Sequence, residues 1–324
     1  MSRPMVVVTR RPPGRALEIL EGVADVWVWP EDTEIPREVL LERVRDAEGL
    51  YSMLSECIDE ELLDAAPRLR VVSNMAVGVD NVDLAACARR GIAVGHTPDV
   101  LTEATADLAW ALLLTVARRV VEGVDHVRQG RWTRWEPGLL LGVDVYGTTL
   151  GIVGLGRIGT AVARRGRGFD MEIRYTARGP KPDVEAELAA RYRELDELLA
   201  EADHVVVTAA LTEETRGLID AAALARMKPT ATLVNVARGP LVDTEALVAA
   251  LREGRIFGAG LDVTDPEPLP PDHPLLALPN CVVVPHVGSA TRRTREAMAE
   301  LAAENLVAGL EGRPLPAPCP FPEL

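Results

Sequence analysis

Three polar side chains in the second half of the chain form a set that can move a proton next to an anionic substrate. Arg238 and His286 each follow a strand-like apolar run, in VNVARGPLVD and VVVPHVGSAT, and Glu267 lies between them in GLDVTDPEPL. The planar fork of an arginine binds a carboxylate and polarises a neighbouring carbonyl. Histidine is the side chain that gains and loses a proton near neutral pH. These residue types favour chemistry on a 2-oxo acid.

The positions of these three segments give them an opportunity to meet, because ligands of open α/β sheets bind outside the carboxyl ends of the strands. There, Glu267 can hydrogen-bond one ring nitrogen of His286, fix its tautomer and favour a protonated ring, ready to donate as hydride arrives from a nicotinamide. Structural roles stay open for each residue: Glu267 as a loop carboxylate between two prolines, Arg238 as a partner of Asp243, and Asp262 as a strand-end cap.

The segment GLGRIG (154–159) follows an apolar run and opens a helical stretch. In a dinucleotide-binding turn, Gly154 permits the tight turn, Gly156 lets the backbone approach a pyrophosphate, and Gly159 lets the helix pack on the strand. The amides at the helix N-terminus then face the anion. The motif alone is weak evidence, because glycines also recur in loops that bind no ligand. The strand–turn–helix context favours a nucleotide site.

The stretch IRYTARGPK (173–181) bears on the choice of nucleotide. An acidic residue expected here would accept hydrogen bonds from the ribose hydroxyls of NAD(H). The chain instead has Ala177, then Arg178 and Lys181, and only two of its 35 basic residues are lysines. A cationic fork suits a 2′-phosphate, so the sequence predicts NADP(H) in preference to NAD(H). The alternative is a solvated basic loop in an arginine-rich chain.

Strand-like runs alternate with helical stretches along the whole chain. Continuous β-branched runs indicate strands that are buried on both faces of parallel sheets, and hence an α/β fold. Two series of such runs predict two domains. The first comprises residues 5–9, 25–29, 49–54 and 69–74, and the second comprises residues 149–154, 171–176, 204–209, 231–236, 257–263 and 281–285.

Two long helices are expected to connect these series. Residues 101–130, with Thr102 as a plausible N-cap, are expected to form one helix. Its wide apolar face is predicted to pack between domains or at a subunit interface. A final helix within residues 291–312 follows the last strand and can return to the first domain.

Composition excludes several other classes of protein. The 324 residues carry a net charge of −14, so the chain as a whole repels nucleic acid and anionic membranes. The longest apolar run, residues 108–117, is too short to span a bilayer, and no targeting segment is visible. We therefore expect a cytoplasmic protein with no nucleic-acid or membrane partner.

The remaining histidines and the cysteines give no sign of a metal site. Cys57, Cys87, Cys281 and Cys319 lie far apart in the sequence, without metal-ligand spacing, and are predicted to be buried thiols in a reducing cytosol. Four histidines have no setting like that of His286 and are expected to be structural or solvent-facing: His96, His126, His204 and His273.

The motifs GLGRIG, VNVARGPLVD, GLDVTDPEPL and VPHVGSAT together resemble the D-isomer-specific 2-hydroxyacid dehydrogenase family across nearly the whole chain. The stretches AVGVDNVDL, RWTRWEP and PHVGSATRRTR narrow the resemblance to its glyoxylate/hydroxypyruvate reductases. The resemblance implies two doubly wound parallel-sheet domains, a Rossmann-type cofactor domain and a flavodoxin-like substrate domain. We expect the substrate domain at residues 1–99 and 288–324, and the cofactor domain at 100–287 with a dimerisation helix near 102–120.

The resemblance also implies roles for individual residues. Arg238, Glu267 and His286 match the catalytic residues, with His286 as proton donor. Expected substrate contacts, besides Arg238 and His286, are Val77, Gly78, Ser289 and a tryptophan of the partner subunit, Trp135 in preference to Trp132, unless that ring merely packs in the interface. Expected cofactor contacts are Thr105, Gly154, Gly156, Arg157, Ile158, Gly159, Arg178, Lys181, Val236, Asp262 and Gly288.

The implied activity is the NADPH-dependent reduction of glyoxylate to glycolate and of hydroxypyruvate to D-glycerate, by a homodimer. Two alternatives stay open. One is another D-2-hydroxyacid dehydrogenase, such as a 2-ketogluconate reductase or a D-lactate type. The other is a nucleotide-sensing protein like the related corepressors, although the chain lacks the long flanking disordered segments expected of such a hub.

Overall fold

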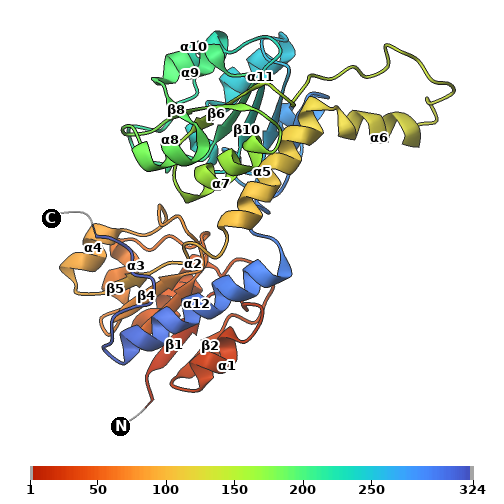
Figure 1. Cartoon of the computed structure of the whole chain (residues 1–324). Coiled ribbons are helices and arrows are strands. Elements are labelled where there is room, and N and C mark those ends of the chain that lie inside the picture. Colours follow the sequence, from red (N-terminus) through yellow and green to blue (C-terminus); the bar gives the residue numbers. More distant parts are fainter. Residues whose placement is uncertain (1–2, 322–324) are drawn as a thin grey trace. The chain divides into compact units, whose positions relative to one another are not determined.

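The computed structural model describes residues 3–321. The chain divides into two units: the residues up to Leu101 together with those from Ser289 onward, and the residues Thr102–Gly288. Each unit contains one parallel β-sheet with helices packed against it, so the predicted α/β class with two parallel-sheet domains is confirmed (Figure 1).

The first unit has a five-stranded sheet in the order β2-β1-β3-β4-β5, the order typical of flavodoxin-like domains. All neighbouring strands run parallel. The strands are β1 (Met5–Val8), β2 (Asp25–Val28), β3 (Gly49–Ser52), β4 (Val71–Asn74) and β5 (Ala93–Gly95). Every residue of β3 and β4 is buried, which explains why these runs are apolar without alternation.

The described residues of this unit form five helices around the sheet, α1 (Ala16–Glu21), α2 (Arg37–Arg43), α3 (Glu60–Ala65), α4 (Leu84–Arg89) and α12 (Arg292–Leu310), with a 3-10 turn, η1 (Val44–Asp46). The predicted final helix is α12, which begins after its capping residue Thr291 and packs against α1, β3 and β4. The approach is close: a Cβ on Gly309 would lie 2.6 Å from Val71 Cγ2. The buried hydroxyl of Tyr51 donates to the carbonyl of Ala299 at 3.1 Å.

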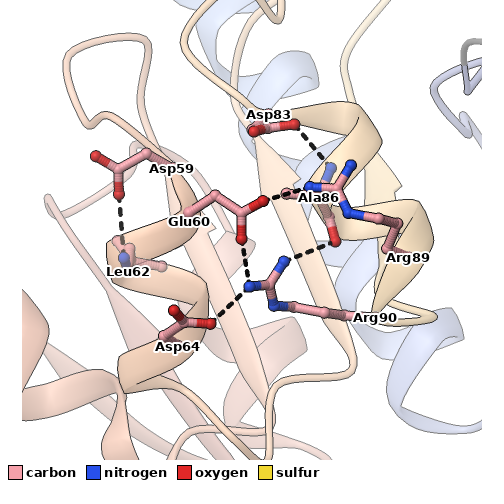
Figure 2. A network of polar contacts seen from close by, with 8 residues as sticks. All are labelled: Asp59, Glu60, Leu62, Asp64, Asp83, Ala86, Arg89 and Arg90. Atoms are coloured by element: carbon pink, nitrogen blue, oxygen red, sulfur yellow. Dashed lines mark hydrogen bonds and ion pairs between the residues drawn. The ribbon is translucent and has the colours of Figure 1, made fainter.

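A network of ion pairs links α3 to α4 on the surface of the first unit (Figure 2). Glu60 pairs with both Arg89 and Arg90, and Arg90 also reaches Asp64 at 2.6 Å. Exposed pairs of this kind contribute on the order of 0–1 kcal/mol each. These arginines therefore have carboxylate partners in the fold and need no ligand to explain them.

The second unit has a seven-stranded sheet in the order β12-β11-β10-β9-β6-β7-β8, with every pair parallel. The chain order reverses between β6 and β9, as in dinucleotide-binding domains. The strands are β6 (Thr149–Val153), β7 (Glu172–Thr176), β8 (Arg191–Tyr192), β9 (His204–Val207), β10 (Thr232–Asn235), β11 (Gly258–Leu261) and β12 (Cys281–Val283). Burying a side chain such as Leu150 or Ile152 completely contributes about 1.5–3 kcal/mol.

The helices of this unit are α5 (Thr102–Ala117), α6 (Val120–Arg128), α7 (Arg157–Arg167), α8 (Pro182–Leu188), α9 (Leu195–Glu201), α10 (Ala221–Arg226) and α11 (Thr244–Arg252), with 3-10 turns η2 (Gly239–Leu241) and η3 (Pro274–Ala277). Helix α5 packs on β10 and β11. Small residues permit this, because a Cβ on Gly258 would lie 2.7 Å from Val116 Cγ1.

Three details differ from the sequence expectations. Thr102 is the first residue of α5, so it does not occupy the expected capping position. The expected continuous helix is divided into α5 and α6, because Arg119 adopts a left-handed conformation with φ of 51°. Cys57 is exposed, whereas Cys87 and Cys319 are buried as predicted and Cys281 is half-buried. In the described part of the chain, none of the helices combines the length and apolarity that crossing a membrane requires.

Candidate active site

The carboxyl ends of β11 and β12 bring His286 and Glu267 into contact. His286 Nδ1 lies 2.6 Å from Glu267 Oε1, and about a quarter and a third of the two side chains are exposed. The hydrogen bond fixes Nδ1 as the donor to the carboxylate. The other ring nitrogen, Nε2, is therefore the one that can exchange a proton with a bound molecule.

Asp262, the residue after β11, holds the backbone that carries His286. Its carboxylate accepts the N–H groups of Val287 at 2.6 Å and Gly288 at 2.8 Å, and its carbonyl accepts the N–H of His286 at 2.9 Å. These bonds stabilise a turn in which His286 has a φ of 52°, a conformation that costs a non-glycine residue free energy. Burial raises the pKa of Asp262, and the two N–H donors oppose that rise.

Glu267 is fixed from its other side by Thr264. The Thr264 N–H donates to Glu267 Oε2 at 3.1 Å, and the Thr264 hydroxyl donates to the Pro266 carbonyl at 2.8 Å. Burial alone would raise the pKa of Glu267. The hydrogen bonds from His286 and Thr264, with the charges of His286 and Arg238, more than offset that effect and hold the pKa below its ordinary value. Glu267 is therefore a carboxylate that can stabilise a protonated imidazole.

Arg238 follows β10 on a backbone held by Asn235. The Asn235 side chain accepts the N–H of Ala237 at 3.0 Å and donates to the carbonyl of Arg238 at 2.8 Å. The next residue, Gly239, approaches the Glu267 loop so closely that a Cβ would lie 1.9 Å from the Thr264 carbonyl oxygen. The structure thus brings Arg238, Glu267 and His286 to one end of one sheet. Sequence reasoning did not identify Asn235 or Thr264, although an asparagine directly at a strand end signals a side chain that binds backbone.

The glycine-rich turn joins β6 to α7. Gly154 has a φ of 98°, and a Cβ there would lie 2.5 Å from the backbone of Ala209. A Cβ on Gly159 would lie 2.3 Å from the Gly154 carbonyl oxygen, so α7 packs directly on the turn. Nothing lies within 4 Å of a Cβ on Gly156, the N-cap of α7. The backbone is therefore accessible at the N-terminus of an 11-residue helix, which is where a phosphate binds.

Further predicted cofactor residues lie around these loops. Gly288 adjoins Thr105, since a Cβ on it would lie 3.3 Å from Thr105 Cγ2. Val236 is buried at the end of β10, and Ile158, partly buried in the first turn of α7, packs against the core. Arg157 begins α7. Arg178 and Lys181 lie exposed after β7, on the loop that leads into α8.

The predicted substrate residues Val77, Gly78 and Ser289 belong to the first unit. There, His96 Nδ1 lies 3.0 Å from the carbonyl of Val77, and the Asn74 side chain donates to the carbonyl of Gly78 at 3.1 Å. The His96 ring therefore lies beside the Val77–Gly78 loop. Of the other histidines, His204 is fully buried and bonded to Thr232 and to the Asp144 carbonyl, a structural role.

The geometry of Thr102–Gly288 defines a class of protein: a dinucleotide-binding domain with a histidine–carboxylate pair at the carboxyl ends of its strands. The profile of the D-isomer specific 2-hydroxyacid dehydrogenase NAD-binding domain matches residues 110–288. The chain belongs to the D-isomer-specific 2-hydroxyacid dehydrogenase family.

Relatives resemble the chain over nearly its full length. The glyoxylate reductase of Thermococcus kodakarensis is 55% identical over 314 residues, covering 96% of this chain and 94% of that protein. The human glyoxylate reductase/hydroxypyruvate reductase is 48% identical, covering 96% of each. The crystal structure of the NADPH-dependent glyoxylate/hydroxypyruvate reductase of Sinorhizobium meliloti, in complex with NADP and malonate, is 36% identical with a TM-score of 0.87. It covers 100% of this chain and 99% of that one.

Proposed function

We propose that this chain reduces glyoxylate to glycolate and hydroxypyruvate to D-glycerate with NADPH. The names of the relatives support glyoxylate as a substrate, and those of the human and Sinorhizobium meliloti proteins add hydroxypyruvate. The contact of 2.6 Å between His286 and Glu267 carries the proposal, because carbonyl reduction needs a proton donor at the forming alkoxide.

Each residue of the pair, and Arg238 beside it, then has a defined task. Glu267 holds His286 in the tautomer and orientation that present Nε2 to the substrate. Arg238 binds the substrate carboxylate and polarises the carbonyl. His286 donates the Nε2 proton to the carbonyl oxygen, which becomes the hydroxyl of the product. Val77, Gly78 and Ser289 remain predicted substrate contacts.

The second unit fits a nicotinamide dinucleotide. Gly154 and Gly159 form the tight turn, and the space at Gly156 leaves the α7 N-terminus accessible for a pyrophosphate near Arg157. When bound, the cofactor supplies the hydride.

The preference for NADPH rests on the loop after β7. Among the described residues, no hydrogen bond or ion pair joins the side chain of Arg178 or Lys181 to another residue. Neighbouring arginines differ, since Arg164, Arg174 and Arg193 pair with carboxylates at 2.9 Å or less. Two exposed cations where NAD-binding domains present an acid suit a 2′-phosphate. A cytoplasmic location, with its NADPH supply, fits this use.

A homodimer is proposed from the exposed apolar arm of the second unit, α6 and the loop after it (Figure 1). Val120, Val121, Val124 and Val127 of α6 are each more than 40% exposed, and Trp135 is 81% exposed. Nearby, Val121, Leu251 and Phe257 line a hollow of about 480 Å³. Apolar surface of this extent marks an interaction site. Val124→Asp should shift the protein from dimer to monomer in sedimentation equilibrium.

A matrix of kcat/KM values tests the proposal, with NADPH and NADH against glyoxylate, hydroxypyruvate, pyruvate and 2-ketogluconate. The two short 2-oxo acids with NADPH should give the highest values. A preference for 2-ketogluconate or pyruvate would replace the substrate assignment by another member of the family. No turnover with any 2-oxo acid would favour a nucleotide-sensing protein.

A further inference from the structure

A buried tyrosine hydroxyl lies against the loop that carries Arg178 and Lys181. Tyr175 is the fourth residue of β7 and is fully buried. Its hydroxyl accepts the backbone N–H of Lys181 at 2.6 Å and donates to Glu185 Oε1 at 2.7 Å. The geometry points to Tyr175 as a positioning residue that holds this loop for the 2′-phosphate and so strengthens selectivity for NADPH. The inference rests on the proposed use of NADPH.

The ring of Tyr175 is fixed by the sheet beneath the loop. Strand β7 lies between β6 and β8, and the Tyr175 carbonyl accepts the N–H of Arg193 at 2.8 Å. The ring packs edge-on against Tyr192, with centroids 5.7 Å apart and planes at 76°. The position of the hydroxyl is therefore set by the core of the domain and does not follow movements of the loop.

The loop depends on that hydroxyl more than on its own contacts. In the described part of the chain, residues 177–181 make one hydrogen bond outside helix α8. It runs from the Lys181 N–H to the Tyr175 hydroxyl. Lys181 is the N-cap of α8, and no side chain caps that helix. Glu185, in its first turn, meets the same hydroxyl, so a single atom ties both the loop and the start of α8 to β7.

The hydrogen bond from the Lys181 N–H to Tyr175 is expected to affect the affinity for NADPH more than the affinity for NADH. A long cationic side chain loses conformational freedom when it binds a phosphate, and a backbone already held in place lowers that cost. NADH has no 2′-phosphate for Arg178 and Lys181 to bind. Loosening the loop should therefore weaken NADPH and leave NADH nearly unaffected.

Two adenosine fragments test this by calorimetry without turnover: 2′,5′-ADP, which carries the 2′-phosphate, and 5′-AMP, which lacks it. Tyr175→Phe keeps the buried ring and removes the hydroxyl. It should weaken 2′,5′-ADP about fivefold, the value of one net hydrogen bond, and change 5′-AMP by less than twofold. Tyr51→Phe is the matched control, because Tyr51 is equally buried and its hydroxyl binds the Ala299 carbonyl in the first unit. It should change neither affinity.

A second variant and a reference variant make the outcome decisive. Glu185→Ala leaves the core intact and removes one partner of the hydroxyl, and should weaken 2′,5′-ADP in the same direction by about twofold. Arg178→Ala reports on the cation itself. Suppose that Arg178→Ala weakens the binding of 2′,5′-ADP. If Tyr175→Phe and Glu185→Ala then leave that binding unchanged, or weaken the binding of both fragments equally, the role of Tyr175 is overturned while NADPH use stands. If the unaltered protein binds the two fragments equally, both the NADPH assignment and this inference fail.

Discussion

Two regions at the carboxyl ends of the same sheet are held in different ways. The loops after β10, β11 and β12 are joined to one another by side chains: Asp262 and Glu267 bind the His286 turn, and Thr244, which begins α11 after β10, donates to the Asp265 carbonyl at 2.9 Å. Within their own loops, Thr264 binds Glu267 and Asn235 binds the Arg238 backbone. The loop of residues 177–181 after β7 rests on the hydroxyl of Tyr175. We call the loops after β10, β11 and β12 the cross-linked region, because several hydrogen bonds hold them. We call residues 177–181 the anchored loop, because the hydroxyl of Tyr175 holds them.

The difference follows from what each region does in the proposed reaction. A proton donor and a carbonyl-polarising fork lose rate steeply when displaced, by about 10²-fold for 1 Å. A phosphate can be reached by long side chains from a range of backbone positions, at the cost of ordering them. We therefore expect damage to the first region to appear in kcat, and damage to the second to appear in the affinity for NADPH.

The largest effect is expected at the centre of the cross-linked region. His286→Ala removes the proton donor and should lower kcat with glyoxylate by about 10²–10⁴-fold, while binding of 2′,5′-ADP stays unchanged. Steady-state kinetics and calorimetry measure the two. His273→Ala is the control: that ring accepts the N–H of Leu275 at the start of η3, and its loss should leave kcat unaltered. A kcat within tenfold of the unaltered value would remove His286 from the proton transfer.

Gly239→Ala tests the cross-linking without touching a reacting group. The new Cβ would lie 1.9 Å from the Thr264 carbonyl oxygen, so the Arg238 loop and the Glu267 loop must separate. We expect kcat to fall by about 10²-fold, with 2′,5′-ADP still bound. Gly123→Ala on α6 is the matched control, because its Cβ would meet Leu140 at an ordinary 3.8 Å. Unchanged turnover in Gly239→Ala would mean that the two loops tolerate separation.

The sequence was sufficient to predict the long features of this fold. The apolar runs matched strands. Arg238, Glu267 and His286 were predicted as site residues from residue type and from their places near strand ends, and the structure places all three after strands of one sheet. Strands β5 and β8 were not predicted, since they have three and two residues and lack the β-branched run that indicates a strand. The break at Arg119 has no glycine or proline to signal it.

The supporting residues were harder to predict, for a common physical reason. Asn235, Thr264, His96 and Tyr175 act on backbone groups, and the positions of those groups depend on loop conformations. Local hydrogen-bonding propensity identifies an asparagine at a strand end as a candidate. It does not tell which backbone atom a tyrosine within a strand will meet several residues later.

A smaller and more selective effect is expected at the anchored loop. Arg178→Ala should raise the KM for NADPH about 10–100-fold, the loss of a charge-assisted contact worth about 1.5–3 kcal/mol, and change the KM for NADH by less than twofold. Arg164→Ala is the control, because Arg164 lies nearby on α7 and pairs with Glu187 at 2.6 Å. Kinetics with each cofactor at saturating glyoxylate measure the ratio. Equal changes for both cofactors would show that Arg178 does not contact the phosphate.

The smallest effect concerns stability, and it compares two carboxylates within the cross-linked region. The folded protein lowers the pKa of Glu267, so its ionised form stabilises the fold above the ordinary value of about 4.3. That contribution is lost as the pH falls through the folded pKa. The folded protein raises the pKa of Asp262 by burial, so the opposite holds: its contribution is present below about 3.9 and is lost as the pH rises through the folded pKa.

Urea unfolding midpoints between pH 3 and pH 6 should separate these two signs. Relative to Glu267→Gln, the unaltered protein should gain stability as the pH rises. Relative to Asp262→Asn, it should lose stability over the same range, because the amide in that variant carries no charge to bury. Parallel slopes for the two variants would contradict the assignment of opposite pKa shifts. Opposite slopes would mean that the fold tolerates an unfavourable buried charge at Asp262, because that carboxylate accepts the N–H groups of both Val287 and Gly288. In the loop after β7, a neutral tyrosine hydroxyl accepts the backbone N–H instead, so no charge has to be buried.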